Sequence, residues 1–395
     1  MEKLSFKHTF FACCTGTLVQ AIACCFMPLL FVTFNREYGI PLTLITLLAT
    51  VNFLAQLATD SLAIFFVRKI GYRRCGVIAH LLAAVGLLVL GLVAPLMENT
   101  YLWIFISVIL FSIGSGLLEV ILSPIVEASP SKNKSAAMSK LHSMYGFGSV
   151  AVILATTVAL TLLGTHIWTY IACFWALIPL LNSVFFLIIP INDISADSQR
   201  MNVGDLLKSR TFWGFALIMA CGGASEIAMS QWSSAFAESS LGISKAAGDI
   251  LGPCAFSLMM ALARVLYARF ASRIDLSKCI ILCGVFGCIC YLAAALVPIS
   301  IVALISCGLC GFAVGILWPG TLSLAAKAYP MGGAALFALM ALAGDIGCTL
   351  GPTVVGFAAS LFGGELKAGL LTGAIFPLIL IVGLSILRKS KKQGM

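Results

Sequence analysis

The sequence GSGLLEVILSPIVEASP at residues 114–130 decides the fold. It lies within an apolar run that is long enough to cross a bilayer, and yet it contains the carboxylate of Glu119. A charge at the centre of a bilayer costs roughly 3 kcal/mol or more, so Glu119 is expected to face protein or water rather than lipid. Helical spacing places three serines on the same face as the acid, and the resulting polar stripe contains Ser112, Ser115, Glu119 and Ser123. We therefore expect this helix to line a solute pathway.

The composition of the whole chain indicates an integral membrane protein. Of 395 residues, 61% are hydrophobic and only 10% are charged, whereas a soluble domain carries about 25% charged residues. Each apolar run along the chain exceeds the ~20 residues that a transmembrane helix needs. The runs lie near 9–34, 44–67, 75–96, 101–128, 139–163, 166–190, 211–238, 245–270, 278–297, 301–326, 332–361 and 365–388. The expected fold class is therefore an all-α membrane protein with twelve transmembrane helices.

The basic residues predict the orientation of these spans. If both termini are cytoplasmic, nearly all lysines and arginines fall in inner segments, and the outer segments hold only Arg36, Lys245 and Lys367. The net charge of +9 is then a topology signal, and no nucleic-acid partner is expected. The longest hydrophilic piece, 191–210, divides the chain in two. We expect a six-helix bundle at 1–190, a cytoplasmic central loop at 191–210 and a second six-helix bundle at 211–395.

The two halves look like diverged copies of one repeat. Residues 311–318 match 113–119 around a shared Gly-Leu/Ile-Leu step, which puts Trp318 where Glu119 lies. Pro130 and Pro330 close the two spans at nearly equal distances. Parallel six-helix repeats are typical of transporters that bind their solute where the repeats meet, near the middle of the membrane.

Residues 60–74, which read DSLAIFFVRKIGYRR, resemble the loop signature of the major facilitator superfamily between its second and third helices. The resemblance rests on Arg68, Gly71, Arg73 and Arg74, with Asp60 as the acid of the signature. Together with the predicted spans and the central loop, it covers the whole chain. It implies two pseudo-symmetric six-helix bundles that alternate access to a central site.

Within that superfamily, the segment Gly-Leu-Leu-Glu119 with Pro124 is similar to the fucose–proton symporter family. A glutamate followed by Asn-Pro is implicated there in substrate and proton handling, and Ser123 stands here in place of the asparagine. That family also has an aspartate in span one, where this chain offers Gln20. The resemblance implies a sugar transporter and leaves its proton mechanism open.

Polar side chains at helical spacing on several spans predict one aqueous cavity, lined with groups that suit a polyhydroxylated solute. Glu226 lies near the middle of the seventh span, the counterpart of the first, so both spans should border this cavity. Tryptophans offer faces for stacking on a sugar, although packing or interfacial anchoring is the alternative. For each polar residue the alternative is an interhelical hydrogen bond, worth about 0.6 kcal/mol. The expected substrate contacts are Gln20, Asn52, Gln56, Glu119, Tyr145, Glu226, Gln231, Trp232 and Trp318.

A second group is expected to couple transport to protons, because burial favours the neutral form of a carboxyl group and allows it to load and release a proton. Its members are Glu119, Glu226, Asp345 and Arg264. Arg264 is the one basic residue placed strictly within a span. The cost of burying its charge predicts a pair with Asp345 or Glu226, which would be either a structural ion pair or a coupling switch.

A third group is expected at the cytoplasmic rim, where carboxylate–arginine pairs would hold the inward gate closed. These residues are Asp60, Arg68, Gly71, Arg73, Arg74 and Glu127.

These features predict a secondary active transporter that moves a small polar solute, a sugar or related polyol, by proton symport. We expect it in the plasma membrane (a bacterial inner membrane), acting as a monomer and driven by a proton or sodium gradient without cofactor, metal or catalytic residue. The sequence contains no Gly-x-x-x-x-Gly-Lys-Ser/Thr motif for binding a nucleotide, so we do not expect ATP to drive transport. One alternative is proton-coupled efflux of drugs or metabolites. A remote alternative is a membrane thiol redox enzyme that uses Cys307 and Cys310.

Overall fold

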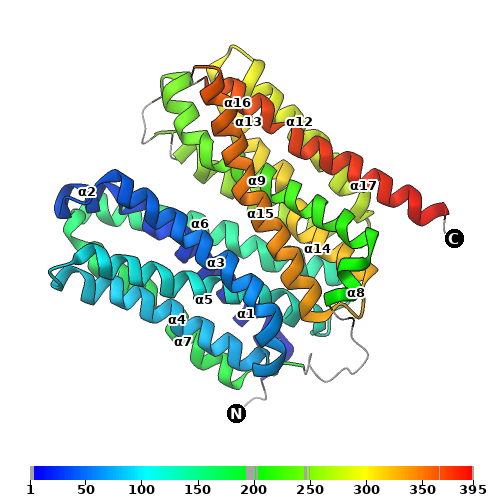
Figure 1. Ribbon diagram of the computed structural model, residues 1–395, viewed down its shortest axis with the longest axis horizontal. Coiled ribbons are helices and arrows are strands. Elements are labelled where there is room, and N and C mark those ends of the chain that lie inside the picture. Colours follow the sequence, from blue (N-terminus) through cyan, green and yellow to red (C-terminus); the bar gives the residue numbers. More distant parts are fainter. Residues whose placement is uncertain are drawn as a thin grey trace. The chain divides into compact units, whose positions relative to one another are not determined.

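The computed structural model describes residues 4–393 apart from 193–200, 202, 244–246, 249 and 364, and within these residues it contains helices and no strand (Figure 1). Eleven of the described helical segments are long and apolar enough to cross a membrane, from Phe6–Leu29 to Leu366–Lys389. The remaining predicted span, 44–67, corresponds to α3, Leu42–Ile70, whose 29 residues also suffice. The prediction of an all-α membrane fold is confirmed, and the predicted spans match helices along the whole described chain.

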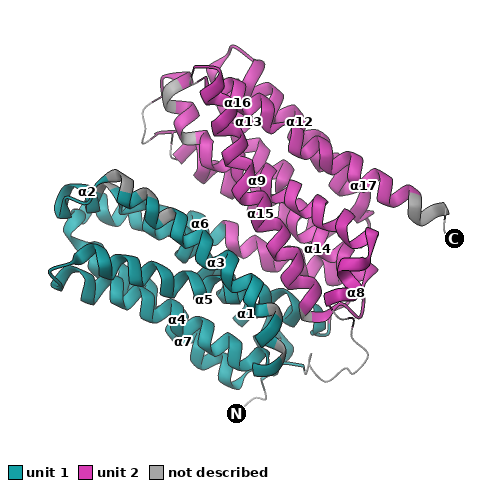
Figure 2. Cartoon of the chain, viewed as in Figure 1, with its two compact units in different colours: residues 1–130, 147–198 teal, residues 131–146, 199–395 magenta. Residues whose placement is uncertain are grey.

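The chain divides into two compact units (Figure 2). Unit 1 contains residues 1–130 and 147–198, and unit 2 contains residues 131–146 and 199–395. The first residues of α6 therefore belong to unit 2. Much of the predicted central loop, at 193–200 and 202, lies outside the described residues, and the division at 191–210 stays a prediction.

Unit 1 is built around α5, which packs against α1, α3 and α4. Its buried core includes Phe26, Phe111 and Trp168. Gly71 has a φ of +88° and separates α3 from α4, so the tight turn in the predicted loop signature uses a backbone conformation that favours glycine. The helices that contribute to this unit are α1 (Phe6–Leu29), α2 (Phe31–Tyr38), α3 (Leu42–Ile70), α4 (Tyr72–Leu88), η1 (Val89–Val93), η2 (Ala94–Leu96), α5 (Thr100–Ala128), α6 (Lys134–Leu163), η3 (Thr165–Ile167) and α7 (Trp168–Ile188).

Unit 2 is built around α9 (Arg210–Leu241) and α15 (Gly333–Leu361), which pack along each other. Its core includes Phe236, Phe256 and Tyr291, and the Tyr291 hydroxyl donates to the Ser225 carbonyl oxygen at 2.8 Å, so this buried polar group is satisfied. Its further helices are α8 (Val203–Lys208), η4 (Ile250–Cys254), α11 (Ala255–Phe270), α12 (Leu276–Leu296), α13 (Ser300–Val314), α14 (Leu317–Ala328), α16 (Leu366–Gly373) and α17 (Ile375–Gln393).

The tenth predicted span is interrupted, whereas its counterpart α5 is continuous. α13 ends at Val314 and α14 begins at Leu317, with Gly315 and Ile316 between them. At this interruption Pro319 has no N–H to donate to the carbonyl of Gly315 four residues earlier, although α5 stays continuous with Pro124 inside it. The neighbouring bonds are present: Gly315 N donates to Gly311 O at 3.0 Å and Gly320 N donates to Ile316 O at 2.9 Å. The Gly315 carbonyl is thus available to a side chain.

Candidate functional site

In unit 1 the predicted polar stripe of α5 faces α3 and forms a buried hydrogen-bonded ladder. The Asn52 side-chain oxygen accepts from Ser112 Oγ at 2.7 Å and from Gln56 Nε2 at 2.8 Å. The Gln56 side-chain oxygen accepts from Ser115 Oγ at 3.2 Å. Asn52 Nδ2 donates to the carbonyl oxygen of Ala23 at 3.4 Å, which connects the ladder to α1. The ladder therefore joins three helices through amide and hydroxyl groups.

Helical spacing and one close approach bring these groups together. Asn52 and Gln56 are four residues apart on α3, and Ser112 and Ser115 are three apart on α5, so each pair shares a face. Gly116 lies between the two helices, where an added Cβ would be 3.1 Å from the backbone of Gln56. The absence of a side chain at Gly116 allows α3 and α5 to approach closely enough for direct hydrogen bonds.

The same face of α3 carries Asp60 beside Glu119. Carboxylate oxygens of these two residues lie within 4.8 Å of each other, and Asp60 has an exposed fraction of 0%. Two carboxylates this close repel each other when both are charged. The pair follows the ladder along α3 and α5, and its predicted part in proton coupling stays a prediction.

The position of Asp60 differs from the sequence-based expectation. We expected it at the rim with the gating residues, but it lies about ten residues before the end of α3 at Ile70, or roughly 15 Å along the helix. The signature was matched loosely at its acid: Asp60 and Arg68 are eight residues apart, which is more than two helical turns. A gating role for Asp60 stays a prediction, and its surroundings place it with Glu119.

Arg73 is held by backbone groups. Its guanidinium donates to the carbonyl oxygens of Phe186, Leu187 and Ile189 at 2.7–2.9 Å, so it caps the C-terminal end of α7, where carbonyl groups lack helical partners. Arg74 is exposed. The cap fixes the α3–α4 turn to α7 within unit 1.

The other unit 1 candidates are Gln20, Glu127 and Arg68. Gln20 is buried in α1, and Glu127 is half-buried near the end of α5. The side chain of Arg68 lies outside the described residues. The roles predicted for these three residues stay predictions.

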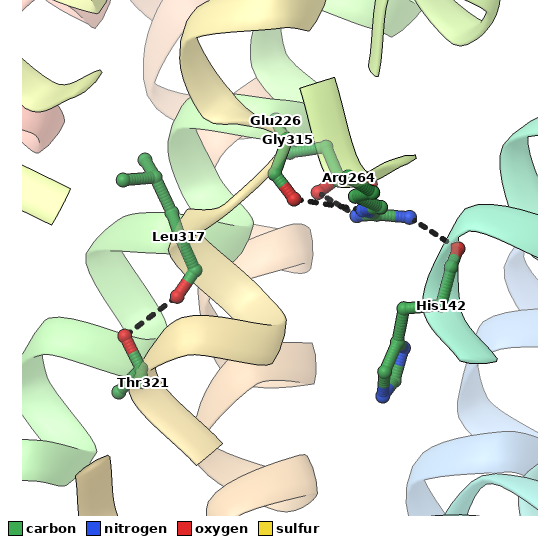
Figure 3. A network of polar contacts seen from close by, with 6 residues as sticks. All are labelled: His142, Glu226, Arg264, Gly315, Leu317 and Thr321. Atoms are coloured by element: carbon green, nitrogen blue, oxygen red, sulfur yellow. Dashed lines mark hydrogen bonds and ion pairs between the residues drawn. The ribbon is translucent and has the colours of Figure 1, made fainter. Parts of the chain in front are cut away.

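Of the two predicted partners of Arg264, Asp345 and Glu226, the structure places Glu226 beside it in unit 2. Arg264 on α11 is 2% exposed and Glu226 on α9 is 8% exposed, and Nη2 of the arginine lies 3.2 Å from Oε2 of the glutamate (Figure 3). The same guanidinium donates through Nε to the Gly315 carbonyl oxygen at 2.7 Å and through Nη1 to the His142 carbonyl oxygen at 2.8 Å. Arg264 thus bonds to α6, α9 and the interruption between α13 and α14.

The aromatic candidates of unit 2 take part in packing. The Trp232 indole N–H donates to the Pro352 carbonyl oxygen at 3.0 Å. The ring of Trp318 lies against Gly344, next to Asp345, which is half-buried in α15. Two further candidates are Tyr145, which packs against the unit 2 core, and Gln231, which is exposed. Stacking on a solute stays a prediction for these rings.

A buried pair that the sequence reasoning did not select lies in unit 1. His80 on α4 is fully buried, and its Nδ1 lies 2.7 Å from the Gly76 carbonyl oxygen, so Nδ1 carries the proton. Its Nε2 accepts from Asn182 Nδ2 at 2.7 Å, and Asn182 also donates to the Ala12 carbonyl oxygen at 3.0 Å. The sequence signal that could have found this pair was the presence of a histidine and an asparagine within predicted spans. Their contacts join α1, α4 and α7 as a structural link.

Comparisons with known proteins agree with this architecture. The family model described as Major Facilitator Superfamily matches residues 9–352, and no curated protein matches the sequence. The solved E. coli fucose:proton symporter has a TM-score of 0.79 and 16% identity, over 96% of this chain and 98% of its own. A proton:xylose symporter has a TM-score of 0.79 and 14% identity, over 97% and 95%. The human organic anion transporter TETRAN has a TM-score of 0.72 and 15% identity, over 96% and 99%. At these identities the structural likeness establishes the fold.

Proposed function

The chain belongs to the major facilitator superfamily, and from this premise we propose that it moves a small polar solute, a sugar or related polyol, by proton-coupled symport. It is a multi-pass membrane transporter and not an enzyme. Cys307 and Cys310, the basis of the redox alternative, are both fully buried within α13.

The observation that carries the proposal is the ladder of unit 1. Its amide and hydroxyl groups, on Asn52, Gln56, Ser112 and Ser115, are the groups with which proteins bind the hydroxyls of a sugar. In the described state these groups bond to one another, so a solute would exchange protein–protein hydrogen bonds for protein–solute bonds. The similar structures of a fucose:proton and a proton:xylose symporter support the same substrate class.

Proton coupling is supported by the carboxylates at the end of the ladder. A proton on Asp60 or Glu119 relieves their repulsion, and its release would restore it. Alternating access would expose this pair to the two sides of the membrane in turn. We propose that the gradient supplies the energy without a cofactor, and that the transporter acts as a monomer in a plasma membrane with both termini cytoplasmic.

The experiment is uptake into proteoliposomes from labelled sugars, polyols, amino acids and nucleosides, with and without a pH gradient. We expect one polar class to accumulate when the gradient is present, and accumulation to be lost in Glu119→Gln. Glu37→Gln is the matched control, because Glu37 is an exposed acid of unit 1 that accepts from Thr165 Oγ1 at 2.6 Å. Equal accumulation by wild type and Glu119→Gln would remove Glu119 from coupling. Accumulation driven by sodium alone, or export against the proton gradient, would overturn proton symport.

A further inference from the structure

The interruption of the tenth span is tied to the rest of unit 2 by one side chain. Arg264 Nε donates to the Gly315 carbonyl oxygen at 2.7 Å, at the point where α13 stops and α14 has not begun (Figure 3). The remaining donors of the guanidinium contact α9 and α6. A planar group with several fixed donors is suited to holding three helices at once.

We infer that Arg264 is a positioning residue that holds the interruption of the tenth span in place, and that this interruption is a joint of the transport cycle. The role of this joint in the transport cycle rests on the proposed function. The positioning role of Arg264 concerns only the geometry of unit 2.

The joint depends on Pro319 as well as on Arg264. In a continuous helix the N–H of residue 319 would donate to the Gly315 carbonyl, and proline has no N–H to donate. A buried carbonyl without a partner is costly, so the arginine supplies the missing donor. The interruption is therefore stabilised by a bond that can be made and broken without disturbing the helical bonds of Gly315 and Gly320.

Glu226 keeps the arginine in place. A buried guanidinium needs a compensating charge, and Oε2 of Glu226 is 3.2 Å from Nη2. The backbone of Arg264 is held independently, because Ser139 Oγ donates to its carbonyl oxygen at 2.7 Å. The guanidinium therefore projects from a fixed point on α11 toward the joint.

Alternating access requires elements that have two arrangements. At Gly315 the carbonyl bonds to a side chain in place of a backbone N–H, so this point of the span can change its angle when the bond to Arg264 breaks. Losing the bond between Arg264 and the Gly315 carbonyl should change how fast this joint moves. The affinity for solute should stay unchanged, since Arg264 acts through the helix and does not touch solute.

Hydrogen–deuterium exchange of the full chain in lipid nanodiscs tests the geometry without any transport assay. In Arg264→Lys, which keeps the charge but loses the planar fork, we expect the amides around Gly315 and Gly320 to exchange about tenfold faster. In Pro319→Ala the new N–H should bond to the Gly315 carbonyl, and the same amides should exchange more slowly. Tyr267→Phe is the matched control: it removes a 3.2 Å bond between α11 and α6, from Tyr267 to Ser135, without touching the joint.

Transport supplies the second readout. Arg264→Lys and Pro319→Ala should each lower the maximal rate about tenfold, with KM within about twofold of wild type. A raised KM with an unchanged maximal rate would make Arg264 a solute contact and overturn its positioning role. If the amides around Gly315 exchange at the wild-type rate in both variants, the Arg264–Gly315 bond does not stabilise the interruption. If Arg264→Lys does not fold, the exchange rates of Pro319→Ala alone decide this question. If wild type transports no polar solute, the proposed function fails while the exchange data still decide the geometry.

Discussion

Asp60 was expected among the gating residues, a role that stays a prediction, and the structure places it beside Glu119. It is fully buried and lies beside Glu119, so we predict that Asp60→Asn uncouples transport from protons. The neutral amide removes the repulsion that makes proton uptake by Glu119 favourable. Solute counterflow should continue within about threefold of wild type, while accumulation against a gradient is lost. Counterflow and pH-driven uptake in the same proteoliposomes measure both effects. Full accumulation by Asp60→Asn would show that Glu119 acts without it.

A second prediction concerns the contribution of the buried Glu226–Arg264 pair to stability. Glu226→Gln leaves a buried guanidinium without its countercharge, which costs about 3–5 kcal/mol in comparable buried pairs. We expect a lower midpoint of thermal unfolding in detergent. The double variant Glu226→Leu/Arg264→Leu removes both charges and should recover part of the loss. A double variant less stable than Glu226→Gln would mean that the bonds of Arg264 to Gly315 and His142 outweigh the ion pair.

Among the elements, α12 offers a test of a single helix start. Asp275 accepts from the Lys278 backbone N–H at 2.9 Å and lies 3.9 Å from Arg388, and the backbone bond, followed by these charges, holds the pKa of Asp275 below its usual value. A lowered pKa stabilises the fold above the pKa of the unfolded chain, about 3.9, and this stabilisation is lost as pH falls through the folded pKa. Asp275 is exposed, so screening reduces the charge contribution and the cap dominates.

We predict that Asp275→Ala lowers stability by about 1 kcal/mol at pH 7 and by less at pH 3. Asp275→Asn should lose only the charge contribution, because its amide oxygen still caps α12. Thermal unfolding of the three proteins at both pH values measures this. Equal losses at the two pH values for Asp275→Ala would show that the charge of Asp275 contributes nothing.

The membrane-spanning helices were predictable because they depend on the length of apolar runs. An interruption within a helix was less predictable, because it depends on a single backbone hydrogen bond. Residues 301–326 predicted one span, and Ser300–Ala328 is long and apolar enough to be one, but hydropathy does not register the interruption at Gly315 and Ile316. The stripe of Ser112 and Ser115 was predictable from spacing alone. Its partners were not, because the rotation of α3 against α5 depends on packing at Gly116. Likewise the cost of burying the charge of Arg264 predicted that it pairs with an acid, and Glu226 and Asp345 were both candidates. Only the structure identifies Glu226 as the partner.

For the whole molecule, the distribution of charge predicts the orientation in the membrane. Basic residues near the chain ends, among them Lys7 and Lys389, should hold both termini on the cytoplasmic side, because translocating them is costly. Fluorescent-protein fusions to the C-terminus should therefore fluoresce in a bacterial host, whereas alkaline phosphatase fused there should be inactive. A phosphatase fusion after Ile299, in the segment between α12 and α13, is the matched control and should be active. An active phosphatase at the C-terminus would reverse the orientation, and with it the side from which the Asp60–Glu119 pair is expected to take up its proton.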